Sequence, residues 1–343
     1  MNWILFHVKA FILVIIIVLR SSALAQDKEK RIGEIEFFGS AGIIDLNKVR
    51  AALPFHEGDE FRIETEGEKV RHSIEEAVKQ VTGHRPTDIA PTCCDNQGNW
   101  IIYIGVSRKA IVYNPQPKGA TRLPKTTLEL YERFMSALSE AVQKGAAAED
   151  RSRGYALSEY PPLRSIQLEM RSYAIAHEAL LRRVLATSAD NQQRIVAAEL
   201  LGYARQSRSQ LAALVHASRD SDDSVRNNAT RALLVLVESK PNLARDVPAE
   251  GFIELLLSGT WTDLNKAGFL LSSITRDRNP KLLARLRTVA VQERLIEMAR
   301  WRTGHAEAAR YLLGRMAGVD EKRLQQLVTS GKVEEILTRL QAK

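Results

Sequence analysis

Cysteine is almost absent from this chain: 343 residues carry only Cys93 and Cys94, and the two are adjacent. One adjacent pair excludes a disulfide framework and cannot supply the ligands of a zinc site. In an oxidising compartment the two thiols can close a ring with each other or pair with another chain. Alternatively, one thiol is buried and the other exposed, because neighbours on a strand point to opposite faces. Cys93 and Cys94 are therefore candidates for a vicinal disulfide.

Motifs of catalysis and cofactor binding are also missing. The chain has no phosphate loop, dinucleotide fingerprint, nucleophile elbow or His-Glu-x-x-His sequence. His72 and His84 have no carboxylate partner at ligand spacing. The acidic residues Asp220, Asp222 and Asp223 lack the glycine and the closing glutamate of a calcium loop, so they are better interpreted as helix caps. We therefore predict no catalytic residue, no cofactor and no metal, and a protein that is not an enzyme.

Aromatic residues are few, at 6%, while the hydrophobic fraction of 45% and the charged fraction of 26% are those of a globular protein. The length leaves room for roughly two domains of about 150 residues. A low aromatic content disfavours a β-sandwich and suits an array of helices rich in alanine and leucine.

The net charge of +8 is unevenly distributed. Residues 151–343 hold 30 Lys and Arg against 21 Asp and Glu, an excess of nine, whereas residues 26–124 hold 14 against 15. A basic half can face an anionic lipid surface, an acidic protein or nucleic acid, or it can be an ordinary solvated surface.

The first 25 residues have the pattern of a signal peptide. A lysine, Lys9, precedes an unbroken apolar run over residues 10–19, which is shorter than the about 20 residues that a membrane span needs. Small residues follow, and Ala23 and Ala25 predict cleavage before Gln26. The mature protein is expected to be periplasmic or secreted, with no transmembrane segment; an uncleaved N-terminal anchor is the alternative.

Residues 31–107 predict a small α+β domain in the order β-α-α-β-β. Residues 32–39 alternate apolar and polar, Asp45 can cap a helix over 46–53, and residues 64–81 have helical spacing. A weak strand over 88–94, a turn over 95–99 and a strong strand over 100–106 complete the domain.

This region resembles the POTRA fold of outer-membrane assembly and secretion proteins. The resemblance is carried by Ile35-x-Phe37-x-Gly39, by Gly58-Asp59-x-Phe61 and by the hairpin that ends at residues 100–106. It implies binding of client chains by strand addition at the sheet edge. The chain departs from the family in having one copy, a middle strand that contains Pro91 and the cysteines, and no β-barrel after it.

An alanine and leucine frame recurs in the C-terminal half. It begins at Ala197, Ala229, Ala267 and Ala309, at intervals of 32, 38 and 42 residues, and each alanine is followed by an apolar pair that contains leucine. Small alanines allow helices to approach closely, and leucines fill the space between layers. Repeats of this length indicate a solenoid.

The sequence from Asp222 to Leu233 resembles the HEAT family, since it follows the pattern Asp-x-x-Val-Arg-x-x-Ala-x-x-Ala-Leu. The resemblance implies that Asp222 and Arg226, and in a second match Asp190 and Arg194, bridge neighbouring repeats. The second match has Gln193 where valine is usual.

We therefore expect residues 1–25 to be a signal peptide, 26–114 a POTRA-like α+β domain, 115–160 a linker with one helix, and 161–343 a HEAT-like α-solenoid. The expected function is that of an exported, non-catalytic scaffold for proteins or extended peptides. The alternative is a basic solenoid that binds an anionic membrane surface or polymer of the envelope. Nucleic acid is disfavoured as a partner because the protein is predicted to be exported.

Overall fold

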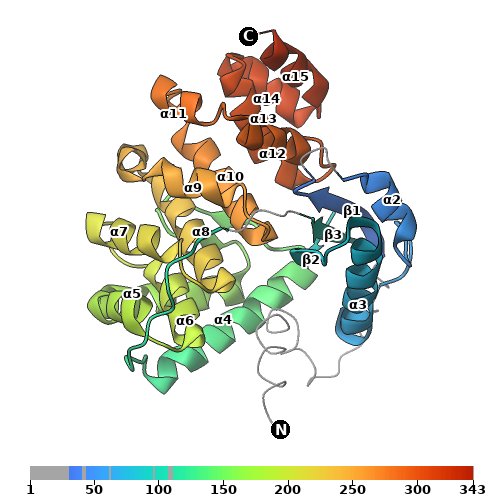
Figure 1. Ribbon diagram of the computed structural model, residues 1–343. Coiled ribbons are helices and arrows are strands. Elements are labelled where there is room, and N and C mark those ends of the chain that lie inside the picture. Colours follow the sequence, from blue (N-terminus) through green and yellow to red (C-terminus); the bar gives the residue numbers. More distant parts are fainter. Residues whose placement is uncertain (1–30, 41–43, 62, 96, 107–110, 343) are drawn as a thin grey trace. The chain divides into compact units, whose positions relative to one another are not determined.

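The computed structural model describes residues 31–40, 44–61, 63–95, 97–106 and 111–342. Within these ranges, residues 63–66 are described by their backbone alone. The described chain is mostly helical, with a small three-stranded sheet near its N-terminal end (Figure 1). The predicted signal peptide, with Ala23, Ala25 and Gln26, lies outside the described residues.

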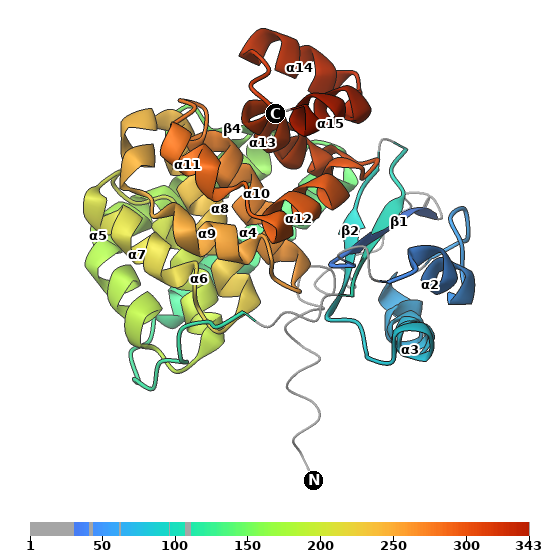
Figure 2. The ribbon, with the colours of Figure 1, turned by 45° about the horizontal axis from the view of Figure 1, so that its top comes forward.

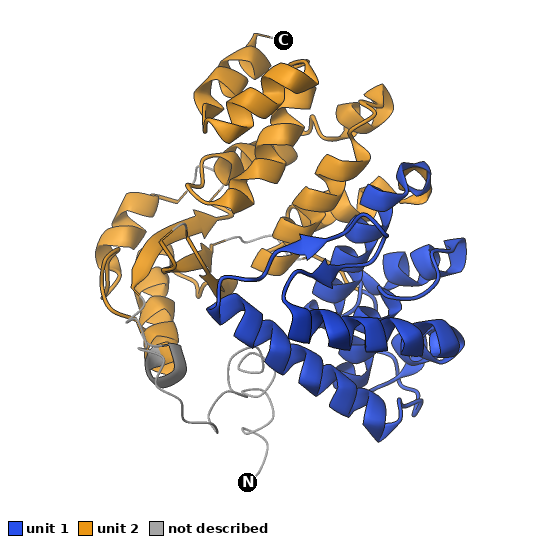
Figure 3. Cartoon of the chain, turned by 180° about the vertical axis from the view of Figure 1, so that it is seen from behind, with its two compact units in different colours: residues 1–28, 114–243 blue, residues 29–113, 244–343 orange. Residues whose placement is uncertain are grey.

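The chain divides into two compact units (Figure 3). Unit 1 contains Asn114–Leu243, and unit 2 combines Glu29–Tyr113 with Ala244–Lys343. The sheet-bearing segment is thus compact together with the last hundred residues. The compact units do not follow the boundaries predicted from the sequence, since unit 2 joins two segments that are far apart in the chain. The predicted domain boundaries therefore remain a prediction.

Unit 2 begins with the elements β1 (Ile32–Phe38), α2 (Leu46–Ala52), α3 (Ile63–Thr82), β2 (Asp88–Cys93) and β3 (Trp100–Gly105). The predicted β-α-α-β-β order is confirmed. The strand order is β1-β3-β2, with β3 parallel to β1 and antiparallel to β2. As expected, the side chain of Asp45 caps α2, accepting hydrogen bonds from the N–H groups of Asn47 and Lys48.

The central strand β3 is buried along its whole length. Figure 2 shows why: the sheet lies between α2 and α3 on one side and α12 (Val289–Ala299) on the other. Ile74 and Val78 of α3 are fully buried, and so is Tyr103 of β3. A strand covered on both faces reads as a continuous apolar run, which matches the sequence of β3.

The rest of unit 2 is helical. Its elements are α9 (Ala249–Leu255), α10 (Trp261–Ile274), α11 (Pro280–Arg285), α12, the short 3-10 helix η3 (Gly304–Ala306), α13 (Glu307–Met316), α14 (Glu321–Thr329) and α15 (Val333–Gln341). Helix α10 packs on α9 and α13, and α13 packs on α12, α14 and α15.

Unit 1 contains α4 (Lys125–Gln143), the short hairpin β4 (Glu149–Asp150) and β5 (Leu157–Ser158), α5 (Pro161–Thr187), α6 (Asn191–Leu201), α7 (Arg208–Ala217) and α8 (Asp223–Ser239). The 3-10 helix η2 (Pro241–Asp246) follows. Helix α5 is kinked at His177, whose backbone is not helical, and it packs on α4 and α6.

The four alanines of the predicted frame are all fully buried in helices. Ala197 lies in α6, Ala229 in α8, Ala267 in α10 and Ala309 in α13. A side chain of this size leaves space for a neighbouring helix at these points. The frame is therefore a packing frame, and the HEAT-like solenoid built on it remains a proposal. None of the helices described combines the length and apolar character needed to cross a bilayer.

Candidate interaction site

Three helices of the alanine frame begin with the same turn. In each, the side chain two residues before the cap accepts a hydrogen bond from the N–H group of the cap residue, at 2.9 to 3.3 Å. The acceptor and donor residues are Ser188 and Asp190 before α6, Asp220 and Asp222 before α8, and Ser258 and Thr260 before α10. The cap residues are 32 and 38 residues apart, the same intervals as the alanines. The sequence repeat therefore has a repeated local structure.

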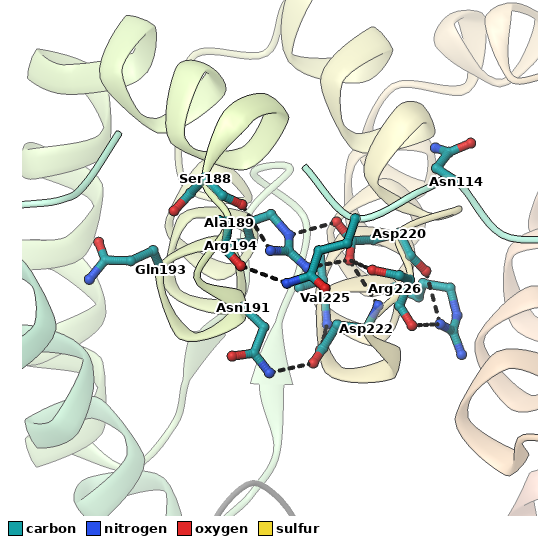
Figure 4. A network of polar contacts seen from close by, with 12 residues as sticks. Asn114, Ser188, Ala189, Asn191, Gln193, Arg194, Asp220, Asp222, Val225 and Arg226 are labelled. Carbon is teal, nitrogen blue, oxygen red and sulfur yellow. Dashed lines mark hydrogen bonds and ion pairs between the residues drawn. The ribbon is translucent and has the colours of Figure 1, made fainter. Parts of the chain in front are cut away.

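Arg194 of α6 is the buried centre of this region (Figure 4). Its Nε and Nη2 donate to the two carboxylate oxygens of Asp220, both at 2.9 Å, and its Nη1 donates to the carbonyl of Ser188 at 2.9 Å. The side chains of Arg194 and Asp220 are 1% and 7% exposed. A bidentate pair of this kind fixes the relative orientation of the two side chains, because two parallel N–H···O bonds must form together.

The predicted Asp and Arg residues come together in this network, but in a different pairing. Asp190 and Asp222 cap α6 and α8 through their side chains. Asp222 also accepts a hydrogen bond from the side chain of Asn191 at 2.9 Å, so it does connect two frames. Arg226 donates to the carbonyl groups of Asp220 at 2.9 Å and Ser221 at 3.2 Å. One ion pair between the frames is thus made by Arg194 with Asp220, two residues before the predicted Asp222.

Arginines also bind main-chain carbonyl groups in both units, in the last turns of helices, beside the kink of α5 and in the loops between helices. The last carbonyls of a helix have no partner within it, and a guanidinium group can supply one. Arg205 donates to Ile175 beside the kink of α5, and Arg310 donates to Ala299 at the end of α12. The other arginines with such bonds are Arg171, Arg194, Arg226, Arg278, Arg287, Arg294 and Arg315. Four of these arginines, Arg194, Arg226, Arg294 and Arg315, are buried, so part of the basic charge of the C-terminal half lies inside the structure.

Residues 114–123, which we call the strap, form an extended segment bound along the helix ends of unit 1. Gly119 pairs with the end of α5: its N–H donates to the carbonyl of Thr187 at 2.7 Å, and its carbonyl accepts from Ala189 at 2.8 Å. The N–H of Asn114 donates to the carbonyl of Arg219, after α7, at 2.7 Å. The sequence predicts a linker over residues 115–160. In the structure, the first part of that range is hydrogen-bonded to helix ends of unit 1.

Side-chain hydrogen bonds also hold the strap in place. Those of Asn114 and Gln116 donate to the carbonyls of His216 and Ala189, at 3.1 and 2.8 Å. At the other end, the N–H of Leu123 donates to the side-chain oxygen of Gln193 at 2.7 Å, and both residues are buried. Gln193 is the residue that departs from the HEAT pattern, and its contact with the strap gives that departure a physical reason.

In unit 2 the sheet meets the helices through aromatic rings. Tyr103 of β3 stacks on Trp261 and packs against Trp301 at an interplanar angle of 58°, with ring centroids 4.9 Å apart in both pairs. Its hydroxyl lies 2.8 Å from Thr303 Oγ1 and 2.8 Å from His305 Nδ1. Burial, and to a smaller extent the charge of Lys266, lowers the pKa of His305 to about 4. His305 is thus neutral in the folded protein near pH 7.

Carboxylates of the sheet satisfy the backbone of unit 2 helices. Asp88 of β2 accepts from the N–H of Trp261, the first residue of α10, at 2.7 Å, where Thr260 provides no side-chain cap. Glu36 of β1 accepts from the N–H of Arg302 at 3.2 Å. Burial raises the pKa of Glu36, although the backbone bond and the charge of Arg302 oppose the rise. Conversely, Glu297 of α12 accepts two N–H groups at the end of β1.

A second, partly buried charge cluster connects the β4–β5 hairpin of unit 1 to the helices of that unit. Arg231 of α8 lies between Glu149 of β4, at 2.5 Å, and Glu199 of α6, at 3.6 Å. Tyr203 and Asn228 line the same depression, which has room for about one water molecule. The cluster is too small for a substrate, and its geometry is that of a structural ion-pair network.

Cys93 and Cys94 are joined by a disulfide in the structure, at the end of β2. Cys93 is half-buried and Cys94 is exposed. Across the residues described, no group of three or more His, Cys, Asp or Glu side chains is placed to hold a metal ion.

The comparisons with known proteins identify no family. No family model and no curated protein matches the chain. One solved structure, the crystal structure of an engineered protein, is similar at 17% identity over 63% of this chain and 95% of that chain, with a TM-score of 0.38. A similarity of this size carries no argument about fold or function.

Proposed function

We propose that the chain is an exported, non-catalytic scaffold that binds other proteins or extended peptides. The observation that carries the proposal is the repeated helix start: the same turn before the first helical residue and the same buried alanine recur in α6, α8 and α10. Chains that repeat one helical building block form extended surfaces that suit partner binding. Under this proposal the helical part is a HEAT-like array.

The sheet of unit 2 provides a second surface in the same proposal. If the domain is POTRA-like, a client strand would add to an edge of the sheet. The outer edge of β1 is already engaged: the N–H of Ile32 donates to the carbonyl of Asp59 at 2.9 Å, and Arg31 bridges to Glu60. The proposal therefore assigns the client to β2, the other edge strand, where Pro91 removes one donor.

Binding of an anionic surface or polymer of the envelope is the second candidate, because residues 151–343 carry the basic excess. Arginines that are bound to main-chain carbonyl groups are less available to bind an anionic surface. Buried Arg194, Arg226 and Arg315 cannot reach a surface. We therefore rank this candidate below the scaffold.

Affinity capture from an envelope extract, at about 0.1 M and about 0.5 M salt, separates the two candidates. A scaffold should retain a saturable protein partner at the higher salt, and the purified partner should bind again on its own. Loss of all capture at high salt, together with binding to vesicles that contain anionic lipid, would instead favour the second candidate, since electrostatic attraction is screened. Absence of any saturable protein partner contradicts the scaffold.

A further inference from the structure

The strap is an extended segment that is bound to helix ends of unit 1. Each contact described above uses a feature that any extended chain offers, namely main-chain N–H and carbonyl groups, or a short amide side chain. The receptor groups are the carbonyls at the ends of α5 and α7 and the side chain of Gln193. The strap residues Pro115, Gln116 and Lys118 remain exposed, so the strap lies on a surface rather than in a core.

We infer that this row of helix ends is a peptide-docking surface, and that the strap is its internal occupant. The inference rests on the proposed scaffold function and assigns the surface to one kind of partner. That partner is an extended polar segment with the spacing of the strap: Asn, then Gln two residues later, Gly three after that, and Leu four after the Gly. A partner segment binds when the strap leaves.

Two positions determine which peptides fit. A Cβ atom on Gly119 would lie 2.5 Å from the carbonyl oxygen of Thr187, so only glycine allows this close approach. Gln193 selects for a main-chain donor near the leucine. At the equivalent place before Arg226, α8 has Val225, which is fully buried and offers no acceptor. Of the two frames of unit 1, only the start of α6 therefore offers an acceptor to the leucine end of the strap.

The covalent connection of the strap keeps the surface closed in the native chain. A tethered segment has an effective concentration on the order of millimolar. A free peptide must therefore compete with a large excess of strap. A substitution that weakens the hydrogen bonds of the strap, without altering the groups that accept them, should make these groups accessible to a free peptide.

The test uses the full chain and a labelled peptide with the sequence of residues 114–124. Gly119→Ala should loosen the strap, and the peptide should then bind at least tenfold more tightly than to the native chain. Gly304→Ala is the matched control, because a Cβ atom there meets nothing within 4 Å; it should leave binding unchanged. Adding Gln193→Val to Gly119→Ala should weaken peptide binding at least tenfold, and a peptide that carries Gly→Ala should bind as weakly.

Hydrogen exchange of the native chain provides a second measurement that does not depend on the variants. The amides of Gly119 and Leu123 should exchange much faster than those within α6, which would show that the strap opens while the helices stay folded. Exchange of these amides only together with α6 would make the strap part of the core and overturn the inference. So would equal peptide binding by the native chain and Gly119→Ala. Either result leaves the scaffold proposal standing if an envelope partner is still captured.

Discussion

The helices of both units follow the same alanine frame, but different groups bind the free backbone N–H and carbonyl groups at their ends. In unit 1 the caps of α6 and α8 are local aspartates, and the helix ends receive an extended strap through main-chain hydrogen bonds. In unit 2 a carboxylate of the sheet, Asp88, serves the start of α10, and aromatic rings join the sheet to the helices. The contacts compared are therefore directional polar bonds in unit 1 and, in unit 2, buried aromatic packing together with a polar cap from the sheet, and mutations should distinguish the two kinds.

The largest effect should come from the aromatic contact of unit 2. Trp301 is 2% exposed, and its indole N–H donates to the carbonyl of Phe37 at 3.2 Å. Trp301→Ala should lower the free energy of unfolding by an amount at the upper end of about 3–5 kcal/mol, because the cavity and the lost hydrogen bond add. Urea unfolding measures it. Trp301→Phe, which keeps a ring, should lose less than half as much; equal losses would refute the role of buried area.

The buried ion pair is the corresponding test in unit 1. Arg194→Ala leaves the carboxylate of Asp220 buried without its partner and should reduce the free energy of unfolding by about 3–4 kcal/mol. The double variant Arg194→Met and Asp220→Leu should recover most of this loss. Arg133→Ala is the control, since Arg133 and Glu169 form an exposed pair, and it should change stability by less than about 1 kcal/mol. A double variant as unstable as the single one would contradict the explanation.

His305 makes the stability of unit 2 depend on pH. The unfolded histidine titrates near pH 6.5, and the folded one has a pKa of about 4. Below pH 6.5 the unfolded state binds a proton that the folded state does not, so stability is full above pH 6.5 and falls between pH 6.5 and 4, by about 3 kcal/mol. Unfolding midpoints across this range, compared between the native chain and His305→Gln, isolate this residue. An unchanged slope in the variant would show that other groups are responsible.

The smallest effect compares a distant cap with a local one. Asp88→Ala removes the acceptor that the sheet offers to α10, and Asp222→Ala removes the local cap of α8. Each should destabilise its helix start by about 1 kcal/mol. Exchange of the first-turn amides of α8 and α10 reports each helix separately. If Asp88→Ala left α10 unchanged, the sheet would have no capping role.

The sequence predicted the regular elements well where one local signal decides. The alternation of residues 32–39, the cap at Asp45 and the spacing of residues 64–81 are short-range patterns, and β1, α2 and α3 follow them closely. The alanine frame was also recognisable, because helix packing requires small residues at fixed intervals. The burial of both faces of β3 cannot be predicted from local patterns, because it depends on helices about two hundred residues later in the chain.

The interaction site was only partly predictable. Asp190, Arg194, Asp222 and Arg226 were found, since their spacing follows a known pattern. The partner of Arg194 was missed because Asp220 stands in a loop, where geometry and not periodicity sets the distance. In the sequence, Gln193 is recognisable only as a departure from the HEAT pattern. An unexplained polar residue at a buried repeat position was the one signal that could have located the strap.

The arginines that bind helix-end carbonyls have a consequence for how the charge of this protein should be engineered. Part of the net charge belongs to arginines that are buried, such as Arg194, Arg226 and Arg315, so the formal charge overstates the charge that the surface offers to an anionic ligand. A charge-neutral variant for binding assays should replace exposed lysines such as Lys118, Lys125 and Lys281. Neutralising arginines at random would remove helix caps along with the charge, and the resulting loss of binding would be mistaken for loss of an anion site.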